Sequence, residues 1–365
     1  MPGLHVNVKQ NETTSKGRGT ALNPPIRFDA ASQEAFDDGW DHEEQENKLQ
    51  TCLIKDTARR IITRNDSPDI YFSQSVNPYR GCEHGCIYCF ARPSHAYLGF
   101  SPGLDFETKI VFKPGAPALL EKELSRPGYK PDVIVLGSNT DPYQPAERTL
   151  GLTRAILEVL ERFNHPVAII TKSAAILRDR DILTRMSAKN LARVHLSITT
   201  LNAELARTME PRASSPRLRL TAISALAKAG IPVDVMASPM IPGLNDAELE
   251  AILEKAKLSG ATSANMTLLR LPYELGDLFT DWLRLHVPER AERVLSLIRQ
   301  TRAGELNSAA FHQRFQGSGP YAALLAQRFQ HSVKRLGLDK AKAAIDLSQF
   351  KIPANSPSSL QMELF

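Results

Sequence analysis

The sequence predicts an α/β fold, a partial (β/α)6 TIM-like barrel with a C-terminal helical extension. Two observations support this fold class. From about residue 70, short apolar and β-branched runs alternate with segments of helical periodicity, which is the pattern of parallel strands joined by helices. After about residue 275 the strand signal stops, and the chain becomes helical and rich in arginine. A doubly wound sheet produces the same alternation and remains the alternative fold.

Six strands alternate with helices in this prediction. The expected strands are 75–78, 133–136, 167–171, 194–199, 233–237 and 264–269. The expected helices are 116–125, 146–163, 174–188, 215–229 and 246–258, and glycines such as Gly230 and Gly260 end several of them. Because a barrel of parallel strands carries its active site at the C-terminal ends of the strands, we expect the functional residues in the loops that follow them.

The chain divides into four predicted parts. Residues 1–55 are predicted to be a mobile polar and acidic tail, because they show no sustained apolar period. The barrel is placed at 56–275, a basic helical extension at 276–348 and a flexible tail at 349–365. Residues 1–48 carry 5 Lys and Arg against 9 Asp and Glu, which leaves 40 against 31 in the remainder. The body of the protein is therefore basic enough to permit an anionic partner.

Composition favours a soluble protein with a metal site. Hydrophobic residues make up 42% and charged residues 23% of the chain, and no apolar run is long enough to span a bilayer. The N-terminus has no hydrophobic signal-peptide stretch, so a cytoplasmic location without a membrane is expected. Three of the four cysteines are clustered at 82–89 while Cys52 stands apart, which indicates a metal and not disulfides.

The clustered cysteines form a C-x3-C-x2-C motif. In the segment NPYRGCEHGCIYCFAR, the thiolates of Cys82, Cys86 and Cys89 can hold three irons of a [4Fe–4S] cluster and leave the fourth iron open as a reaction site. Gly81 and Gly85 allow the loop to turn tightly around a bulky cluster. Since the loop follows the first predicted strand, the cluster is expected at the mouth of the barrel.

A structural zinc site is the alternative for this motif. The three cysteines together with His84 or His95 supply ligands of the types that zinc prefers. Structural zinc sites usually come from two paired ligand motifs, and the sequence has no second C-x-x-C pair. This observation disfavours zinc and a non-enzymatic zinc-binding interaction module.

The cysteine motif resembles the signature of the radical S-adenosylmethionine (SAM) superfamily, with Tyr88 in the aromatic place before the third cysteine. Over about 70–270 the chain is also similar to the spore photoproduct lyase-like branch of that superfamily. The similarity recurs in order on successive predicted strands. The segments that carry it are NPYRGC with HGCIYCFAR, GSNTDPYQPAE at 137–147, ITKSAAILRDRDIL at 170–183, VHLSITTLN at 194–202, MEPRASSPRLR at 209–219 and SPMIPGLND at 238–246.

The resemblance implies two cofactors and a set of contacts. In this family the open iron binds SAM, and one electron from the reduced cluster cleaves SAM to a 5′-deoxyadenosyl radical that abstracts hydrogen from the substrate. Matched position by position, Ser138, Lys172 and Ser197 fall where the lyase contacts SAM, and Tyr88 joins this cofactor-binding set. From the residues alone, Ser138 can equally cap a helix, Lys172 can be a surface charge, and Ser197 can bond to neighbouring backbone.

Three further polar positions lie within the matched segments, and one expected residue is missing from them. Asp141, Glu210 and Arg217 fit either catalysis or an ion pair that fixes loop geometry. Spore photoproduct lyase has a cysteine beside its second strand that returns hydrogen to the product radical, whereas this chain reads VIVLGS at 133–138. The lyase reaction is therefore not inherited. Cys52 is either a residue that reaches the site or a small buried hydrophobe.

The C-terminal part of the chain indicates partners. Residues 284–342 hold 11 Lys and Arg against 4 Asp and Glu, a composition that can follow a phosphate backbone, although aromatic residues at helical spacing are usually core residues. The basic and aromatic residues of this region are Arg314, Arg328, Lys334, Arg335, Phe311, Phe315, Tyr321 and Phe329.

The last five residues, QMELF, resemble the short peptide by which bacterial replication and repair proteins bind the DNA sliding clamp. Leu364 and Phe365 would fill an apolar pocket of the clamp and Gln361 would hydrogen-bond at its edge, with the preceding Pro/Ser stretch as a linker. The alternative is that Leu364 and Phe365 fold back on the domain.

Together these features predict a radical SAM enzyme that acts on nucleic acid, in DNA repair or modification, with a cellular one-electron donor. The first alternative keeps the radical chemistry but directs it at a protein or a small metabolite. The second is the non-enzymatic zinc-binding module.

Overall fold

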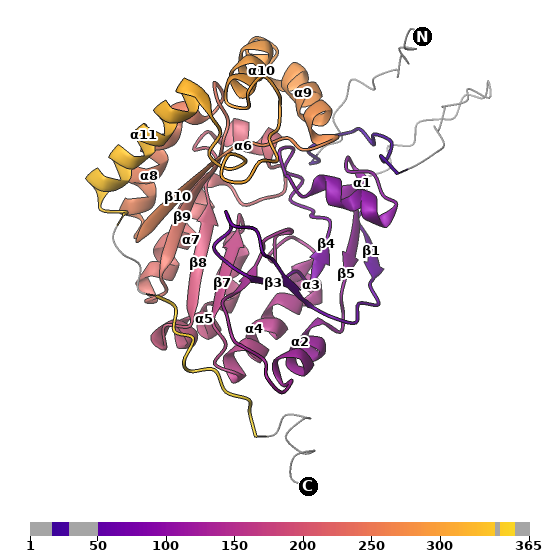
Figure 1. Cartoon of the computed structure of the whole chain (residues 1–365), viewed down its shortest axis with the longest axis vertical. Coiled ribbons are helices and arrows are strands. Elements are labelled where there is room, and N and C mark those ends of the chain that lie inside the picture. The colour runs from indigo at the N-terminus through magenta and orange to yellow at the C-terminus, as the bar shows by residue number, and fades with distance from the viewer. Residues whose placement is uncertain (1–16, 29–49, 340–343, 355–365) are drawn as a thin grey trace, which may run out of the picture.

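The computed structural model describes residues 17–28, 50–339 and 344–354, and its central element is an open barrel of parallel strands (Figure 1). Six strands pair in chain order, each parallel to the next. They are β3 (Gln74–Val76), β6 (Ile134–Leu136), β7 (Val167–Thr171), β8 (Ala192–Ser197), β9 (Val233–Met240) and β10 (Ser263–Leu268). The partial barrel and all six of its predicted strands are confirmed. The sequence does not predict β2 (Ile62–Arg64), which pairs antiparallel with β3 at the edge of the sheet.

Helices and 3-10 turns connect the strands and cover the sheet (Figure 1). They are α2 (Ala116–Leu124), α3 (Glu147–Leu150), α4 (Leu152–Arg162), η2 (Ala174–Asp179), α5 (Arg180–Ala188), α6 (Ala203–Met209), α7 (Pro216–Lys228), η3 (Asp246–Glu248) and α8 (Leu249–Leu258). In α4, Leu152, Ile156 and Leu160 recur every four residues and are buried, which is the apolar stripe that packs a helix on a sheet. Because the strand order follows the chain without a reversal, the doubly wound alternative is wrong.

A second, three-stranded sheet flanks the barrel, and the sequence does not predict it. β1 (Cys52–Lys55) pairs parallel with β5 (Lys109–Phe112), and β4 (Tyr79–Arg80) pairs antiparallel with β5. β1 has only four residues, Cys-Leu-Ile-Lys, and is mostly exposed, so its short apolar run does not mark it as a core strand. It lies inside the segment 1–55 that the sequence assigns to a mobile tail, so that part of the predicted tail is folded.

The C-terminal part shares a core with the cysteine loop. α9 (Leu275–His286) and α10 (Ala291–Gln300) pack in one hydrophobic cluster with Cys86, Ile87 and Tyr88, so the predicted boundary at residue 275 does not separate two cores. α11 (Gly319–Leu336) lies along α8 at the side of the barrel (Figure 1).

An irregular segment, 301–318, joins α10 to α11. It crosses the end of β10, where the Leu268 amide donates to the Phe315 carbonyl at 2.8 Å. The sequence predicts continuous helix here, because the segment is short of the β-branched apolar runs that mark strands. The residues of this segment therefore reach the mouth of the barrel instead of lying on an outer helix.

Much of the positive charge of the helical extension is paired within the protein. Tyr321 and Phe329 pack against the main hydrophobic core and are not free stacking surfaces. Three of the four basic residues named above form ion pairs with acidic residues of the barrel region, Arg314 with Asp69, Arg328 with Glu250 at 2.6 Å and Arg335 with Glu254 at 2.5 Å. The extension thus offers less free positive charge than the sequence suggests.

Two predictions concern properties of the whole chain. No helix in the described part of the chain is long and apolar enough to cross a membrane. The proposed clamp-binding residues Gln361, Leu364 and Phe365 lie outside the described residues.

Candidate active site

A cavity of about 390 Å³ lies at the C-terminal ends of the barrel strands. Ser138 follows β6, Lys172 follows β7 and Ser197 ends β8, so strands far apart in sequence contribute to one wall. The structure brings all seven residues of the predicted site to this cavity, namely Cys82, Cys86, Cys89, Tyr88, Ser138, Lys172 and Ser197.

A buried arginine fixes the shape of the cysteine loop, which connects β4 to a 3-10 helix, η1 (Arg92–Leu98). The guanidinium of Arg92 donates from Nε to the Cys86 carbonyl at 2.9 Å and from Nη2 to the Gly85 carbonyl at 3.0 Å, and it pairs with Glu107. Gly85 has a φ of +67°, and a Cβ atom there would lie 2.6 Å from Glu107 Oε2. The sequence predicts the need for Gly85 but gives no signal for Arg92 or Glu107.

Part of the N-terminal segment packs behind the same loop. The Gly19 amide donates to Glu107 Oε2 at 3.0 Å, and Arg18 Nη1 donates to the Glu107 carbonyl at 2.9 Å. A Cβ atom on Gly19 would lie 1.9 Å from the Gly85 carbonyl oxygen, so only glycine permits this approach of two backbones. Residues 17–22 therefore support the cysteine loop from the side of Glu107.

A buried carboxylate links the cysteine loop to the ends of β6 and β7. Asp141 Oδ2 lies 3.3 Å from His84 Nδ1 and accepts from the Lys172 amide at 2.8 Å, while Asp141 Oδ1 accepts from Thr171 Oγ1 at 2.7 Å. Burial by itself raises the pKa of Asp141, but the neighbouring His84 and these hydrogen bonds lower that pKa to about 2. Asp141 is therefore ionised and holds the backbone that carries the Lys172 side chain.

A second buried ion pair lies beneath Tyr88. Arg219 pairs with Glu210, and Glu210 accepts from Thr199 Oγ1 at 2.6 Å and from the Tyr88 hydroxyl. Burial alone raises the pKa of Glu210, but the charges of Arg219 and Lys172 lower it to about 2. The sequence leaves two roles open for Glu210, catalysis or an ion pair that fixes loop geometry. These contacts favour the ion pair.

Arg217 is not the partner of Glu210. Arg217 is exposed on α7, whereas Arg219, two residues later, points inward and is 1% exposed. Arg219 Nη1 also donates to the Ser197 carbonyl at 3.1 Å. The sequence thus identifies the correct segment but names the other arginine. Residues two positions apart point to opposite faces of a helix, so Arg219 faces the buried carboxylate when Arg217 faces outward.

The candidate cofactor contacts are held by nearby polar groups. Lys172 Nζ lies 5.7 Å from the centre of the Tyr88 ring, and both residues line the cavity. The Lys172 ammonium group is therefore a charge of the cavity wall and not a surface charge. The Ser138 hydroxyl accepts from Asn77 Nδ2 at 3.1 Å instead of capping a helix. The cavity therefore presents a cation and a hydroxyl on neighbouring strand ends.

The thiols of the loop lie in surroundings that suit metal-bound sulfur. Burial raises the pKa of Cys82 well above its ordinary value and that of Cys86 to about 12. At Cys86 the charge of Glu210 acts in the same direction, while Lys172 lowers the pKa. Thiols in such a place stay protonated unless a metal supplies compensating charge, so the donor set fits an iron–sulfur cluster.

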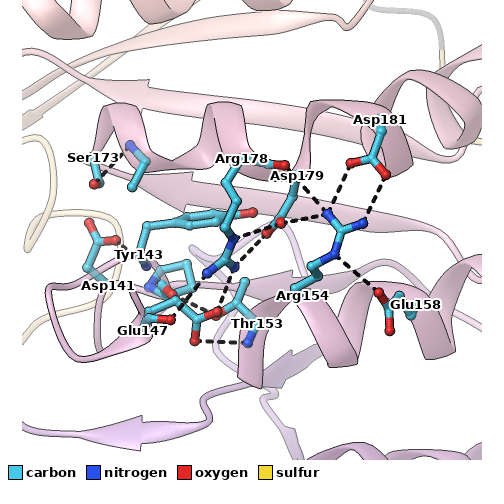
Figure 2. A network of polar contacts seen from close by, with 12 residues as sticks. Asp141, Tyr143, Glu147, Thr153, Arg154, Glu158, Ser173, Arg178, Asp179 and Asp181 are labelled. Atoms are coloured by element: carbon cyan, nitrogen blue, oxygen red, sulfur yellow. Dashed lines mark hydrogen bonds and ion pairs between the residues drawn. The ribbon is translucent and has the colours of Figure 1, made fainter. Parts of the chain in front are cut away.

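A charged network fixes the loops after β6 and β7 (Figure 2). Arg178 of η2 donates to Glu147 Oε1 at 2.7 Å and to Asp179 Oδ2 at 2.9 Å. Arg154 of α4 also contacts Asp179, at 3.1 Å, and contacts Asp181 at 2.9 Å. Glu147 and Asp179 are almost fully buried and belong to the segments that carry the family resemblance. Their role here is to hold the loop geometry of the site.

Several residues of the cavity wall are not predicted from the sequence. Arg270 follows β10 and lines the cavity together with four aromatic residues, Tyr71, Phe72, Phe90 and Phe315. These residues come from loops and from the irregular segment 301–318, where no periodic pattern marks them. Of these residues, only Phe315 is singled out in the sequence, as one of the aromatic residues of the basic region, and nothing there assigns it to the cavity.

The remaining candidate ligands lie elsewhere. His84 is paired with Asp141, and His95 Nε2 lies 3.1 Å from the Lys109 carbonyl oxygen. Cys52 is exposed on β1 and is not among the residues that line the cavity. Cys52 therefore fits neither of the two roles that the sequence leaves open, because it is neither at the site nor buried.

Comparison with known proteins establishes the family. A model of the radical SAM superfamily matches residues 76–256. An uncharacterized protein of Mycobacterium tuberculosis is 37% identical over 231 residues, which cover 63% of this chain and 68% of that protein. The chain belongs to the radical SAM superfamily. An uncharacterized protein of Methanocaldococcus jannaschii is also similar to this radical SAM enzyme, 29% identical over 196 residues, which cover 54% of this chain and 70% of that protein.

Solved structures share the fold of this radical SAM enzyme. Spore photoproduct lyase complexed with dinucleoside spore photoproduct matches with a TM-score of 0.55 at 15% identity, over 78% of this chain and 79% of that chain. Radical SAM enzymes use a [4Fe–4S] cluster and SAM, and these are the cofactors of this chain. Family membership replaces the alternative of a non-enzymatic zinc-binding module.

Proposed function

We propose that this radical SAM enzyme acts on nucleic acid, in DNA repair or modification, with lyase-like radical chemistry that does not use the hydrogen-returning cysteine of spore photoproduct lyase. The observation that carries the proposal is the composition of the cavity. Its wall combines the three thiols of the cysteine loop with the rings of Tyr71, Phe72, Phe90 and Phe315, and aromatic rings offer stacking faces to bases. Spore photoproduct lyase, which shares the fold, has been solved with a dinucleoside in complex, and this supports a substrate of the same class.

In this proposal the residues of the wall have distinct roles. Cys82, Cys86 and Cys89 hold three irons of the cluster, and the bound cofactors supply a one-electron cleavage that yields the 5′-deoxyadenosyl radical. Lys172 offers an ammonium group to the carboxylate of SAM, and Ser138 and Ser197 offer polar groups from the adjacent strand ends.

The buried ion pairs keep this set of contacts in place. Glu210 accepts a hydrogen bond from Tyr88 and so fixes the ring over which Lys172 lies. Asp141 accepts from the backbone amide of Lys172 and fixes the loop from which that side chain extends. Neither carboxylate lies free in the cavity, so we assign both to positioning and not to catalysis.

Two partners and a location complete the proposal. The terminal peptide with Gln361, Leu364 and Phe365 binds the DNA sliding clamp, and a cellular protein supplies single electrons to the cluster. The cytoplasm is the compartment in which both partners would be met. The basic body of the chain supports an approach to nucleic acid. Because Arg328 and Arg335 of α11 are already paired with carboxylates, we assign the main contact to the cavity mouth.

The first experiment tests the cluster and its ligands. In protein reconstituted without oxygen, dithionite and SAM are expected to yield 5′-deoxyadenosine. Cys82→Ala, Cys86→Ala and Cys89→Ala are each expected to abolish that product, because a missing thiolate prevents stable assembly of the cluster. Cys52→Ala is the matched control, because Cys52 is exposed outside the cavity and its loss is expected to have no effect. Product formation by any of the three cavity variants would remove that cysteine from the ligand set.

The second experiment tests the substrate class. Addition of single-stranded or damaged DNA is expected to change the rate of SAM cleavage, and DNA binding is expected to weaken with rising salt. The competing function is radical chemistry on a protein or small metabolite. A rate that responds to a peptide or metabolite fraction and is unaffected by DNA would refute the nucleic-acid proposal while leaving the cofactor chemistry intact.

A further inference from the structure

Arg270 is a cation at the cavity wall that forms no ion pair among the described residues, and the nearby carboxylate of Asp69 is already paired with Arg314. Across residues 17–28, 50–339 and 344–354, its guanidinium makes no hydrogen bond and no ion pair, and its Nε atom is buried. Arg270 as a whole is half-buried, and a partly buried guanidinium without a hydrogen-bond partner loses water at Nε that no protein group replaces. Such a residue is typical of a site that is completed by an anionic ligand.

The neighbouring arginines do not share this condition. Arg314 forms an ion pair with Asp69. Arg302 donates to the Leu269 carbonyl at 2.6 Å and to the Gln313 carbonyl at 2.8 Å. The missing partner is therefore specific to Arg270 and is not a general property of this basic region.

Two aromatic rings hold the Arg270 side chain in place. Its guanidinium carbon lies 4.7 Å from the centre of the Phe90 ring and 5.4 Å from the centre of the Phe315 ring. Phe90 directly follows Cys89 in the cysteine loop, and Phe315 belongs to the segment that crosses the end of β10. A guanidinium positioned in this way is preorganised, so a ligand that binds it does not have to order a mobile side chain.

We propose that Arg270, held between Phe90 and Phe315, binds a phosphate group of the nucleic-acid substrate at the mouth of the cavity. This inference rests on the proposed function and names the contact by which the substrate backbone is held. Lys172 lies near Tyr88 and is assigned to the carboxylate of SAM, so Arg270 serves a second anion. A planar guanidinium matches the geometry of two phosphate oxygens.

The surroundings of Arg270 favour a nucleotide over a carboxylate of a protein. The Tyr71 ring lines the same cavity and is 68% exposed, so one of its faces is available to a base. Phe72 adds further aromatic surface to the same cavity, and Phe90 lies against the guanidinium. A phosphate between a cation and several rings is the arrangement that a nucleotide requires, whereas an acidic peptide needs only the cation.

The test uses a ligand with a single phosphate. Thymidylyl-thymidine and its methylphosphonate analogue, which has the same shape without the charge, are bound to the reconstituted enzyme in the presence of SAM. Equilibrium dialysis is expected to show that the wild-type protein prefers the charged form by about tenfold or more, as expected for one charge-assisted contact. Arg270→Gln is expected to reduce this preference to about twofold or less, and Arg270→Lys to restore part of it.

The control and the other outcomes separate this inference from the proposed function. Arg126→Gln removes an equal charge from an exposed site in the loop after α2, and it should retain the preference for the phosphate. Equal binding of both dinucleotides by the wild-type protein would overturn the inference alone. Binding of neither dinucleotide would overturn both proposals. Loss of SAM cleavage in Arg270→Gln with unchanged dinucleotide binding would overturn the inference and assign Arg270 to the cofactors.

Discussion

Several buried charged side chains near the cavity form ion pairs, and each of these pairs fixes one part of the wall. Arg92 with Glu107 holds the cysteine loop, and Arg219 with Glu210 holds Tyr88. Loss of one partner from such a pair costs about 3–5 kcal/mol, because it leaves the other charge buried and unpaired. Arg270 differs from all of them because it lacks a partner within the described ranges, and this difference is what identifies it as a binding residue.

The sequence identifies reactive residues more readily than supporting ones. Cys82, Cys86 and Cys89 share one short motif whose spacing alone indicates their chemistry. Arg92 and Glu107 have no such motif, since Arg92 acts on backbone carbonyls and Glu107 receives contacts from Arg18, 89 positions away along the chain. Contacts of this kind exist only after folding, so single letters in a sequence do not reveal them.

The buried imidazole of His165 gives stability a dependence on pH. Burial lowers the pKa of His165 to about 4, against an ordinary value of 6.5. In the unfolded chain the imidazole takes up a proton near pH 6.5, so this group contributes stability above that pH that is lost as pH falls toward 4. The full contribution is about 3 kcal/mol, of which about 2 kcal/mol is lost by about pH 5.

His165→Gln is therefore expected to reduce the change in unfolding free energy between about pH 7 and about pH 5 by about 2 kcal/mol. Urea unfolding followed by circular dichroism at the two pH values measures this change. The control is His331→Gln on α11, where the imidazole is exposed. A pH dependence that is the same in His165→Gln and wild type would show that His165 does not carry it.

At the scale of elements, prediction succeeds where strands are buried and regularly spaced. All six barrel strands are found from the sequence, because five of them follow a predicted helix at regular spacing and most contain a run of apolar or β-branched residues. The small sheet of β1, β5 and β4 is not found, because β4 has two residues and β1 is mostly exposed. Such strands are stabilised by pairing with each other, for which a linear sequence carries no periodic signal.

The N-terminal segment is an element whose importance appears only in three dimensions. Gly19→Ala would place a Cβ atom 1.9 Å from the Gly85 carbonyl oxygen, so the segment or the cysteine loop must move, at a cost of about 1–3 kcal/mol. In the reconstituted enzyme, the iron–sulfur absorbance of Gly19→Ala is expected to bleach several-fold faster in air. Absorbance recorded over time after exposure to air measures the rate.

A matched glycine separates this effect from the general cost of an added methyl group. Gly115 has an ordinary negative φ, and no atom lies within 4 Å of the position that a Cβ atom would take there, so Gly115→Ala is expected to bleach at the wild-type rate. If Gly19→Ala also bleaches at that rate, the segment 17–22 does not protect the loop. The two variants differ only in what surrounds the methyl group.

At the scale of the whole molecule, the two ends of the barrel have separate tasks. The cavity lies at the C-terminal ends of the strands, beside Lys172 and Ser197. The segment 344–354 passes the opposite end, where the Asp346 amide donates to the Asn190 carbonyl at 3.0 Å, ahead of β8. Phe350 stacks on Phe163 with ring centres 6.3 Å apart, ahead of β7.

The last described residues of the chain lie at the end of the barrel opposite the cavity. The Lys351 amide donates to the Phe163 carbonyl at 3.0 Å, so the described chain up to Ala354 lies at the N-terminal end of the barrel. A partner bound to the terminal QMELF peptide would then leave the cavity mouth open to substrate. Clamp binding and SAM cleavage are expected to be independent for this reason.

Deletion of residues 361–365 is accordingly expected to leave dithionite-dependent formation of 5′-deoxyadenosine unchanged within about twofold and to weaken binding to the bacterial DNA sliding clamp by at least about tenfold. Surface plasmon resonance on immobilised clamp measures the affinity. A full-length triple variant, Gln361→Ala with Leu364→Ala and Phe365→Ala, tests whether the lost side chains, and not the shorter chain, weaken binding. Equal affinity of the deleted and intact proteins would refute the docking role. A parallel loss of SAM cleavage would instead show that the peptide folds back on the barrel, because only a peptide packed on the domain can affect a cavity at its other end.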